Sequence, residues 1–251
     1  MLLSLIYPLF NAGLTALGNA VNANPVAGGF VFGTANRLLI PLGLHHIINS
    51  VVWFILGDFN GVHGDLNRFF AGDPNAGVFM TGFFPIMMFA LPAAALAIWH
   101  EARPEQRKVV GGIMASVALT SFLTGITEPL EYAFVYVAWP LYLIHAVLTG
   151  TSLALVNALG IHDGFTFSAG ALDYLVNFGA ATKPLLLIPI GLVYAVIYYV
   201  VFRFVIRRWN LRTPGREIEN DPETTPDTPE APTTETAPTT DTAPAAEAPR
   251  A

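Results

Sequence analysis

A short polar motif interrupts one of the longest apolar stretches of this chain. It contains Glu128, Pro129 and Glu131, and the flanking segments 111–122 and 132–148 contain no Asp, Glu, Lys or Arg. An ionisable side chain between two membrane-like segments indicates a functional site, because a charge is costly to place in a bilayer. Transporters put substrate sites where backbone is broken at membrane depth and covered by protein or water. The chemistry that Glu128 suggests is therefore substrate binding inside a membrane.

The same residues also fit an ordinary helix start. Glu128 would then be the N-cap, with Pro129 at the favoured first helical position and Glu131 in the first turn, stabilised by the helix dipole. We accept this interpretation for Glu131 and expect its replacement by Gln to have little effect. For Glu128 we favour the site, because an interfacial cap is not usually enclosed by two apolar runs.

Two further residues with possible site chemistry lie in the apolar run 30–56. Arg37 and His45 are eight residues apart, close to two helical turns, so they share a face if Pro41 only kinks the helix. Two alternatives remain open. Arg37 could extend to the membrane interface, and single histidines are more often satisfied polar groups than ligands.

The composition indicates a polytopic all-α membrane protein. The chain is 53% hydrophobic and 12% charged, with a mean hydropathy of +0.53 over 251 residues. Its net charge of -6 comes from residues 212–251, which hold 9 acidic and 3 basic residues. The rest of the chain has equal numbers of acidic and basic residues, so its charge does not indicate a nucleic-acid partner. The absence of cysteine excludes disulfides and thiolate metal sites on these residues.

Apolar segments long enough to cross a bilayer define the predicted transmembrane helices. They cover residues 1–21, 30–56, 78–99, 109–127, 130–148 and 184–206. Residues 151–159 and 165–178 are too short to span and predict re-entrant hairpins.

The loop 57–77 is polar, and we expect it to be structured. His63 and Asp65 lie in it, but without a third ligand at suitable spacing they do not predict a metal site.

Basic residues at 103–108 and 203–216 mark the cytoplasmic side. If both basic clusters lie on the cytoplasmic side, the chain must cross the membrane an even number of times between them. The apolar segments between the clusters provide three crossings. Either a hairpin is miscounted or region 151–178 supplies a fourth crossing.

The chain divides into two predicted parts. Residues 1–211 form a membrane-embedded domain, and residues 212–251, which are rich in Thr, Pro, Ala and Glu, form a disordered cytoplasmic tail.

Four motifs carry a family resemblance. They are residues 33–46 (GTANRLLIPLGLHH), 63–65 (HGD), 123–131 (LTGITEPLE) and 211–217 (LRTPGRE). In this order they resemble enzyme IIC, the sugar permease of the bacterial phosphoenolpyruvate-dependent phosphotransferase system, glucose superfamily, over roughly residues 28–217. Residues 67–69, 83–89 and 167–174 look like the N-acetylglucosamine branch, while residues 118–128 suit the glucose branch equally well.

The resemblance implies a function and a site. The chain would bind N-acetylglucosamine or glucose in an occluded membrane pocket through Arg37, His45 and Glu128, with Glu128 also assisting the chemistry. In this family the sugar is phosphorylated from a phosphocysteine on a B component, and since this chain lacks cysteine we expect a separate enzyme IIB protein as partner. No cofactor is implied. The implied location is the bacterial plasma membrane.

The resemblance also implies about five further helices before the region matching Met1. The chain therefore looks like the C-terminal transport half of the family, with a homodimer or a separate scaffold half as further partners. The alternative is a truncated, non-transporting membrane protein that acts as a sugar sensor or assembly partner. An ion-coupled transporter is disfavoured, because the motifs match group translocation.

Overall fold

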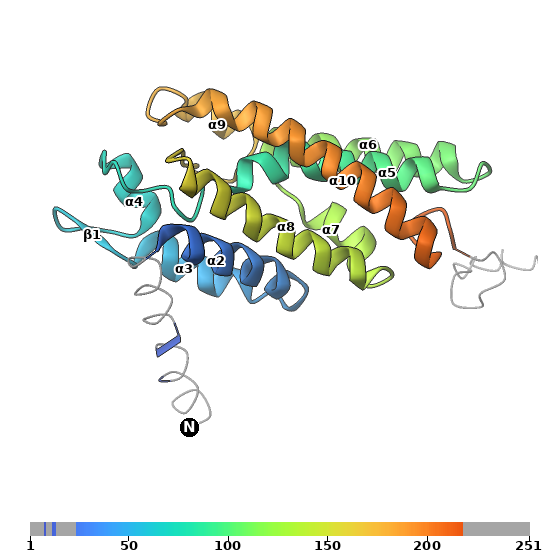
Figure 1. Cartoon of the computed structure of the whole chain (residues 1–251), viewed down its shortest axis with the longest axis horizontal. Helices are drawn as coiled ribbons and strands as arrows, with labels where there is room; N and C mark the ends of the chain where they lie inside the picture. Colours follow the sequence, from blue (N-terminus) through green and yellow to red (C-terminus); the bar gives the residue numbers. More distant parts are fainter. Residues whose placement is uncertain (1–7, 9–11, 14–23, 218–251) are drawn as a thin grey trace, which may run out of the picture. The chain divides into compact units, whose positions relative to one another are not determined.

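The computed structural model describes Pro8, Ala12, Gly13 and residues 24–217. The predicted membrane helix 1–21 falls almost wholly outside the described residues, and so do residues 218–251 of the predicted tail. The described part is mostly helical (Figure 1). Its elements are α2 Pro25–Leu39, η1 Ile40–Leu42, α3 His45–Phe54, β1 Asp58–Phe59, β2 Val62–His63, α4 Asp65–Phe70, η2 Pro85–Ala90, α5 Leu91–Glu101, α6 Arg107–Thr124, α7 Glu128–Val135, α8 Trp139–Ala158, α9 Ala171–Asn177, η3 Pro184–Leu186 and α10 Leu187–Trp209.

Two helices in this described part are long and apolar enough to cross a membrane. They are α8, with 20 residues, and the continuous helix Pro184–Trp209, with 26 residues. Residues 187–206 of the predicted span 184–206 therefore lie in α10.

The apolar run 30–56 forms a helical hairpin instead of one span. The helix α2 stops at Leu39, Pro41 lies in the short turn η1, and Gly43 adopts a left-handed conformation with φ of 68°. The helix α3 then returns beside α2, and the Asn36 side chain donates a 2.6 Å hydrogen bond to Asn49 across the pair. Pro41 thus ends the helix rather than kinking it, so the expectation of one kinked helix was wrong.

The predicted span 78–99 begins later than its apolar pattern suggests. Residues 78–82 form turns, and helix follows from residue 83, including the apolar helix Pro85–Glu101. Its first part, η2, is a π-helical turn.

The predicted span 130–148 is divided between two helices. The helix α6 ends at Thr124, Gly125 turns the chain with φ of 71°, and α7 begins three residues later. Residues 136–138 separate α7 from α8, and Phe134 packs against Tyr142 and His145 of α8. The helices α7 and α8 therefore pack against each other on either side of this turn, so residues 130–148 do not form one continuous span.

The same helix α8 corrects a second prediction. Residues 151–159 are not a separate hairpin segment, because Thr151 to Ala158 form the second half of α8. Residues 165–178 do contain a short helix, α9.

The helices α2 and α8 pack side by side through small residues (Figure 1). A Cβ atom on Gly33 would lie 3.1 Å from the Cα of Gly150, and one on Gly150 would lie 2.6 Å from the carbonyl oxygen of Phe30. Glycine at both positions lets the two backbones approach closely, as in many membrane helix pairs.

The loop 57–77 is structured, as predicted. It contains the β1–β2 hairpin and α4. Both carboxylate oxygens of Asp65 accept backbone hydrogen bonds of 2.9 Å, from Gly77 and Phe79, so this buried side chain holds the loop together.

The two basic clusters meet at one end of the helices. The Glu101 carboxylate at the end of α5 accepts hydrogen bonds from Arg203 (2.6 Å) and Arg207 (2.7 Å) of α10. Beyond α10 the chain folds back, where the amide of Arg103 donates to the Gly215 carbonyl and Arg216 donates to the Glu101 carbonyl. These contacts extend five residues past the predicted boundary at residue 211, and the boundary itself stays a prediction.

Candidate functional site

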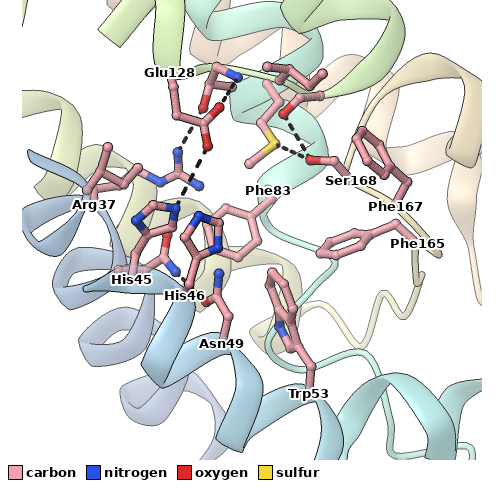
Figure 2. Close-up of a pocket in the computed structure, with 16 residues that line it drawn as sticks. Arg37, His45, His46, Asn49, Trp53, Phe83, Glu128, Phe165, Phe167 and Ser168 are labelled. Carbon is pink, nitrogen blue, oxygen red and sulfur yellow. Dashed lines mark hydrogen bonds and ion pairs between the residues drawn. The ribbon is translucent and has the colours of Figure 1, made fainter. Parts of the chain in front are cut away.

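A cavity of about 240 Å³ lies where two breaks in the helices meet. One break is the tip of the α2–α3 hairpin and the other is the α6–α7 turn at Gly125 to Thr127. Figure 2 shows the side chains around this space. Its polar lining comprises Asn36, Arg37, His45, His46, Asn49, Thr127, Glu128 and Ser168, and its aromatic lining comprises Trp53, Phe83, Phe165 and Phe167.

All three predicted site residues line this cavity. Arg37 comes from α2, His45 from the start of α3, and Glu128 from the start of α7. Glu128 Oε1 lies 3.8 Å from His45 Nε2, and 37% of the Glu128 side chain remains exposed. Two residues 83 positions apart in the sequence, His45 and Glu128, therefore meet here, and the Glu128 carboxylate remains accessible to a ligand.

The N-cap of α7 is Thr127, not Glu128. Glu128 is the first helical residue, and its Oε2 accepts a 3.1 Å hydrogen bond from the Thr127 amide. The carboxylate thus satisfies one free N–H at this helix start and keeps its other oxygen towards His45 (Figure 2).

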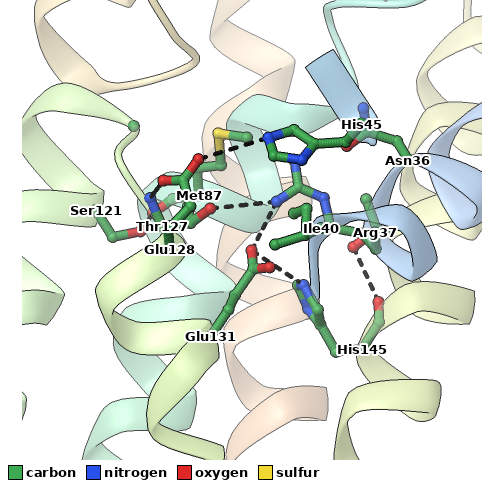
Figure 3. A network of polar contacts seen from close by, with 12 residues as sticks. Asn36, Arg37, Ile40, His45, Met87, Ser121, Thr127, Glu128, Glu131 and His145 are labelled. Carbon is green, nitrogen blue, oxygen red and sulfur yellow. Dashed lines mark hydrogen bonds and ion pairs between the residues drawn. The ribbon is translucent and has the colours of Figure 1, made fainter. Parts of the chain in front are cut away.

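Arg37 is held in place by a buried acid that sequence reasoning missed. Its Nη1 donates to Glu131 at 2.6 Å and to the Thr127 hydroxyl at 3.2 Å, and the Arg37 and Glu131 side chains are 4% and 0% exposed. The Tyr142 hydroxyl and His145 Nε2 lie 3.3 and 3.4 Å from the same carboxylate. Figure 3 shows Glu131 between Arg37 and His145. Glu131 is therefore the centre of a buried polar network.

This finding corrects the interpretation of Glu131. It does lie in the first turn of α7, but its main partner is a guanidinium on another helix. A signal was present in the sequence, since an arginine deep in an apolar run needs a countercharge, and Glu131 is one of few acids in the membrane domain.

Several polar atoms around the cavity lack a hydrogen-bond partner. They are Asn36 Oδ1, Arg37 Nε, His45 Nδ1 and Trp53 Nε1, all buried and all on lining residues. Buried polar atoms in proteins are nearly always hydrogen-bonded, so four around one cavity indicate that it receives a polar molecule.

Aromatic rings form much of the remaining wall. Trp53 and Phe165 pack edge to face with ring centroids 5.1 Å apart, and the Arg37 guanidinium lies 4.8 Å from the Phe83 ring centroid. An aromatic wall with a few convergent polar groups is typical of small-molecule sites. The volume is below the roughly 300–1,000 Å³ of sites for drug-sized ligands, so the cavity suits a smaller molecule.

Comparison with known families now identifies the chain. Residues 1–150 match the family described as "Phosphotransferase system, EIIC". The chain belongs to the enzyme IIC family. The resemblance carried by the four motifs is thereby confirmed.

Curated relatives extend the match towards the C-terminus. The chain is 54% identical over 224 residues to the "PTS system N-acetylglucosamine-specific EIIC component" of Streptomyces coelicolor, an alignment that covers 87% of this chain and 54% of the relative. It is 54% identical over 212 residues to the "PTS system N-acetylglucosamine-specific EIICB component" of Bacillus subtilis, covering 84% and 47%. It is 47% identical over 237 residues to the "PTS system glucosamine-specific EIICBA component" of the same organism, covering 92% and 37%. The chain spans about half or less of the length of these relatives.

Proposed function

We propose that this chain forms the sugar-binding part of a phosphotransferase-system permease and that its substrate is N-acetylglucosamine. The observation that carries the proposal is the cavity at the two helix breaks, where Arg37, His45 and Glu128 meet among unpartnered polar atoms. The names of the Streptomyces and one of the Bacillus relatives support N-acetylglucosamine over glucose.

Each of the three residues has a distinct task in this proposal. The exposed part of the Glu128 carboxylate accepts hydrogen bonds from sugar hydroxyls, and Arg37 Nε and His45 donate to sugar oxygens. The aromatic wall covers the apolar face of the sugar ring. Because Glu131 already neutralises Arg37, Glu128 is left as the charged acceptor of the site.

The proposed reaction transfers a phosphoryl group to the bound sugar. The sugar hydroxyl attacks the phosphorus of a phosphocysteine on a separate B protein, the O–P bond forms, and the S–P bond breaks to leave a thiolate. Glu128 takes the hydroxyl proton as general base, a contribution of typically 100-fold or more. The B protein supplies the cysteine, since these 251 residues contain none, and the fused name of a relative, EIICB, supports such a partner.

The proposed arrangement in the membrane follows from the helix lengths. The helices α8 and α10 cross the bilayer, whereas the α2–α3 pair and α7 enter it as hairpins, because helices of 15, 10 and 8 residues are too short to span. The basic residues near Glu101 mark the cytoplasmic end, which is also where the tail leaves in this proposal.

The proposal is tested with Glu128→Gln. Gln keeps the shape but removes the charge. A hydrogen bond to a charged group contributes roughly 1.5–3 kcal/mol and a neutral one about 0.5–1.5 kcal/mol, so the weaker bonds to the sugar hydroxyls are expected to lower the affinity for N-acetylglucosamine at least tenfold. Calorimetric titration of the detergent-solubilised chain measures it, followed by phosphoryl transfer from a phosphorylated B protein, which should fall further than binding. Glucosamine and glucose, titrated in parallel, test the choice of sugar.

Each outcome of this experiment assigns a role. Unchanged affinity with a lowered melting temperature would reduce Glu128 to a helix-capping residue and refute the site. Normal sugar binding by the unsubstituted chain without any phosphoryl transfer would favour a sugar sensor or assembly partner over a permease.

A further inference from the structure

A second hollow, which shares no lining residue with the cavity at the helix breaks, lies on the exposed side of α10 near its C-terminal end. It measures about 460 Å³ and is lined by Tyr199, Val200, Arg203, Phe204, Arg207 and Arg208. These residues recur every three or four positions, so they form one stripe along the helix. The stripe combines two exposed apolar side chains, Val200 (57%) and Phe204 (65%), with three arginines.

The arginines are partly arranged in advance by an acid outside the stripe. Glu101 accepts from the Nε atoms of Arg203 and Arg207, and Arg203 Nη1 donates to the Tyr199 hydroxyl at 2.8 Å. Burial raises the pKa of Glu101, but the hydrogen bonds from the two arginines outweigh it and hold this pKa below its usual value. The ionised Glu101 neutralises one arginine, which leaves an excess of two positive charges.

The donors that remain free face outwards from this arrangement. The Arg207 side chain is 60% exposed, and its two Nη groups have no hydrogen bond within residues 24–217. Arg208 is exposed and has no ion pair or hydrogen bond in the same part of the chain. Guanidinium groups with free Nη donors bind phosphate oxygens in a fork geometry.

The depth of the stripe matches the boundary of a bilayer. A crossing needs about 20 residues, so a helix that enters near Leu187 reaches the opposite headgroups near Ile206. Val200 and Phe204 then lie at the level of acyl chains, and the three arginines lie at or within one turn of the phosphates.

We propose that the end of α10 is a binding site for one anionic phospholipid. Its phosphate lies among Arg203, Arg207 and Arg208, and one acyl chain lies along Val200 and Phe204. The charge excess selects an anionic headgroup over a zwitterionic one, and the apolar half of the stripe selects a lipid over a free phosphate ion. Glu101 acts as a positioning residue that fixes two of the guanidinium groups.

Native mass spectrometry of the full chain in detergent tests this proposal. Phosphatidylglycerol and phosphatidylcholine with identical acyl chains are titrated, and tighter binding of phosphatidylglycerol is expected. The double variant Arg207→Gln, Arg208→Gln is expected to lose about fivefold in affinity per arginine, while its phosphatidylcholine binding stays unchanged and shows that it folds. The control is Arg103→Gln, which removes an exposed arginine at the same end but outside the stripe.

Three results would overturn the proposal. Equal binding of the two lipids would remove the headgroup selectivity. Displacement of phosphatidylglycerol by an equal concentration of inorganic phosphate would show a site for a free anion. Disulfide-linked dimers of Phe204→Cys in phosphatidylglycerol bilayers would show that a second copy of the chain covers this face, and the result is unambiguous because the chain contains no other cysteine.

Discussion

At the scale of single residues, Arg37 has two kinds of neighbour and therefore two tasks. Its Nη1 is occupied by Glu131 and Thr127, whereas its Nε is buried without a partner beside the cavity. The contacts of Nη1 balance the charge of Arg37. The unpartnered Nε is a directional donor that a ligand can use.

The variant Arg37→Lys separates these two tasks. An ammonium group can still pair with Glu131 but cannot at the same time present a second, fixed donor to the sugar. We expect a melting temperature near that of the unsubstituted chain and at least a tenfold loss of N-acetylglucosamine affinity, as measured by calorimetry. Near-normal affinity would place Arg37 outside the set of ligand contacts.

Glu131→Gln has the opposite expected effect. It leaves the Arg37 charge buried without its counter-ion, and breaking a buried pair in this way costs about 3–5 kcal/mol. Thermal unfolding in detergent should show a large loss of stability; the expectation from sequence was that this change would have little effect on sugar affinity and phosphoryl transfer. Glu105→Gln is the control, since Glu105 is exposed.

A double variant distinguishes stability from binding at this network. Arg37→Met with Glu131→Leu removes both charges, so we expect most of the stability to return while sugar binding stays lost. A double variant as unstable as Glu131→Gln alone would show that the pairing itself is not what Glu131 contributes.

Local motifs were sufficient to bring Arg37, His45 and Glu128 forward as candidates, and the structure places all three at one cavity. Glu131 was missed because its partner lies 94 positions away on another helix, a relation that helical spacing does not encode. The aromatic wall was likewise hidden, because a tryptophan or phenylalanine in an apolar run has the same pattern whether it faces lipid or a ligand.

At the level of helices, the lengths of the apolar runs predicted where apolar segments lie along the chain. They did not predict where the chain turns within those segments. An interruption at the polar motif with Glu128 and Pro129 was expected, and α6 does end just before it, whereas the turn at residues 136–138 was missed. Pro140 was the available signal, since proline is favoured in the first turn of a helix. The turn was not recognised because the residues on both sides of it are apolar. In a membrane domain, a turn that is covered by protein need not be polar.

The close packing of α2 and α8 makes a prediction at this scale. Gly150→Ala would place a methyl group 2.6 Å from the Phe30 carbonyl oxygen, and a backbone atom cannot move aside cheaply. We expect destabilisation of about 1–3 kcal/mol in thermal unfolding. Gly112→Ala is the matched control, because a Cβ there meets nothing within 4 Å and should stabilise α6 by roughly 0.5–1 kcal/mol. Equal effects of the two changes would show that the helices do not need this close approach.

At the scale of the whole molecule, two apolar clusters are joined through the polar site. One centres on α5, α7, α8 and α10, and the other on α2, α3 and residues 76–88. Arg37 belongs to the second group of helices and Glu131 to the first, so their ion pair connects the two clusters beside the cavity. A ligand at the cavity therefore contacts side chains from both clusters.

The folded unit extends past the end of the membrane domain that composition predicts. Sequence composition places the end of the membrane domain at residue 211, but Gly215 and Arg216 contact Arg103 and Glu101 through hydrogen bonds of 3.0 and 3.1 Å. A chain that ends at Leu211 loses these contacts, each contributing about 1 kcal/mol. At roughly 2–4 °C per kcal/mol for a unit of this size, its melting temperature should fall by about 4–8 °C.

A chain that ends at Glu217 is the matched control for this truncation. It keeps both contacts and removes only residues rich in Thr, Pro, Ala and Glu, which have no apolar pattern to pack, so it should melt with the full chain in the same detergent. Arg216→Gln in the full chain should reproduce part of the loss, because it removes the donor to the Glu101 carbonyl. If the chain ending at Leu211 melts with the other two, residues 212–217 add nothing to the fold and the boundary expected from composition is the correct one.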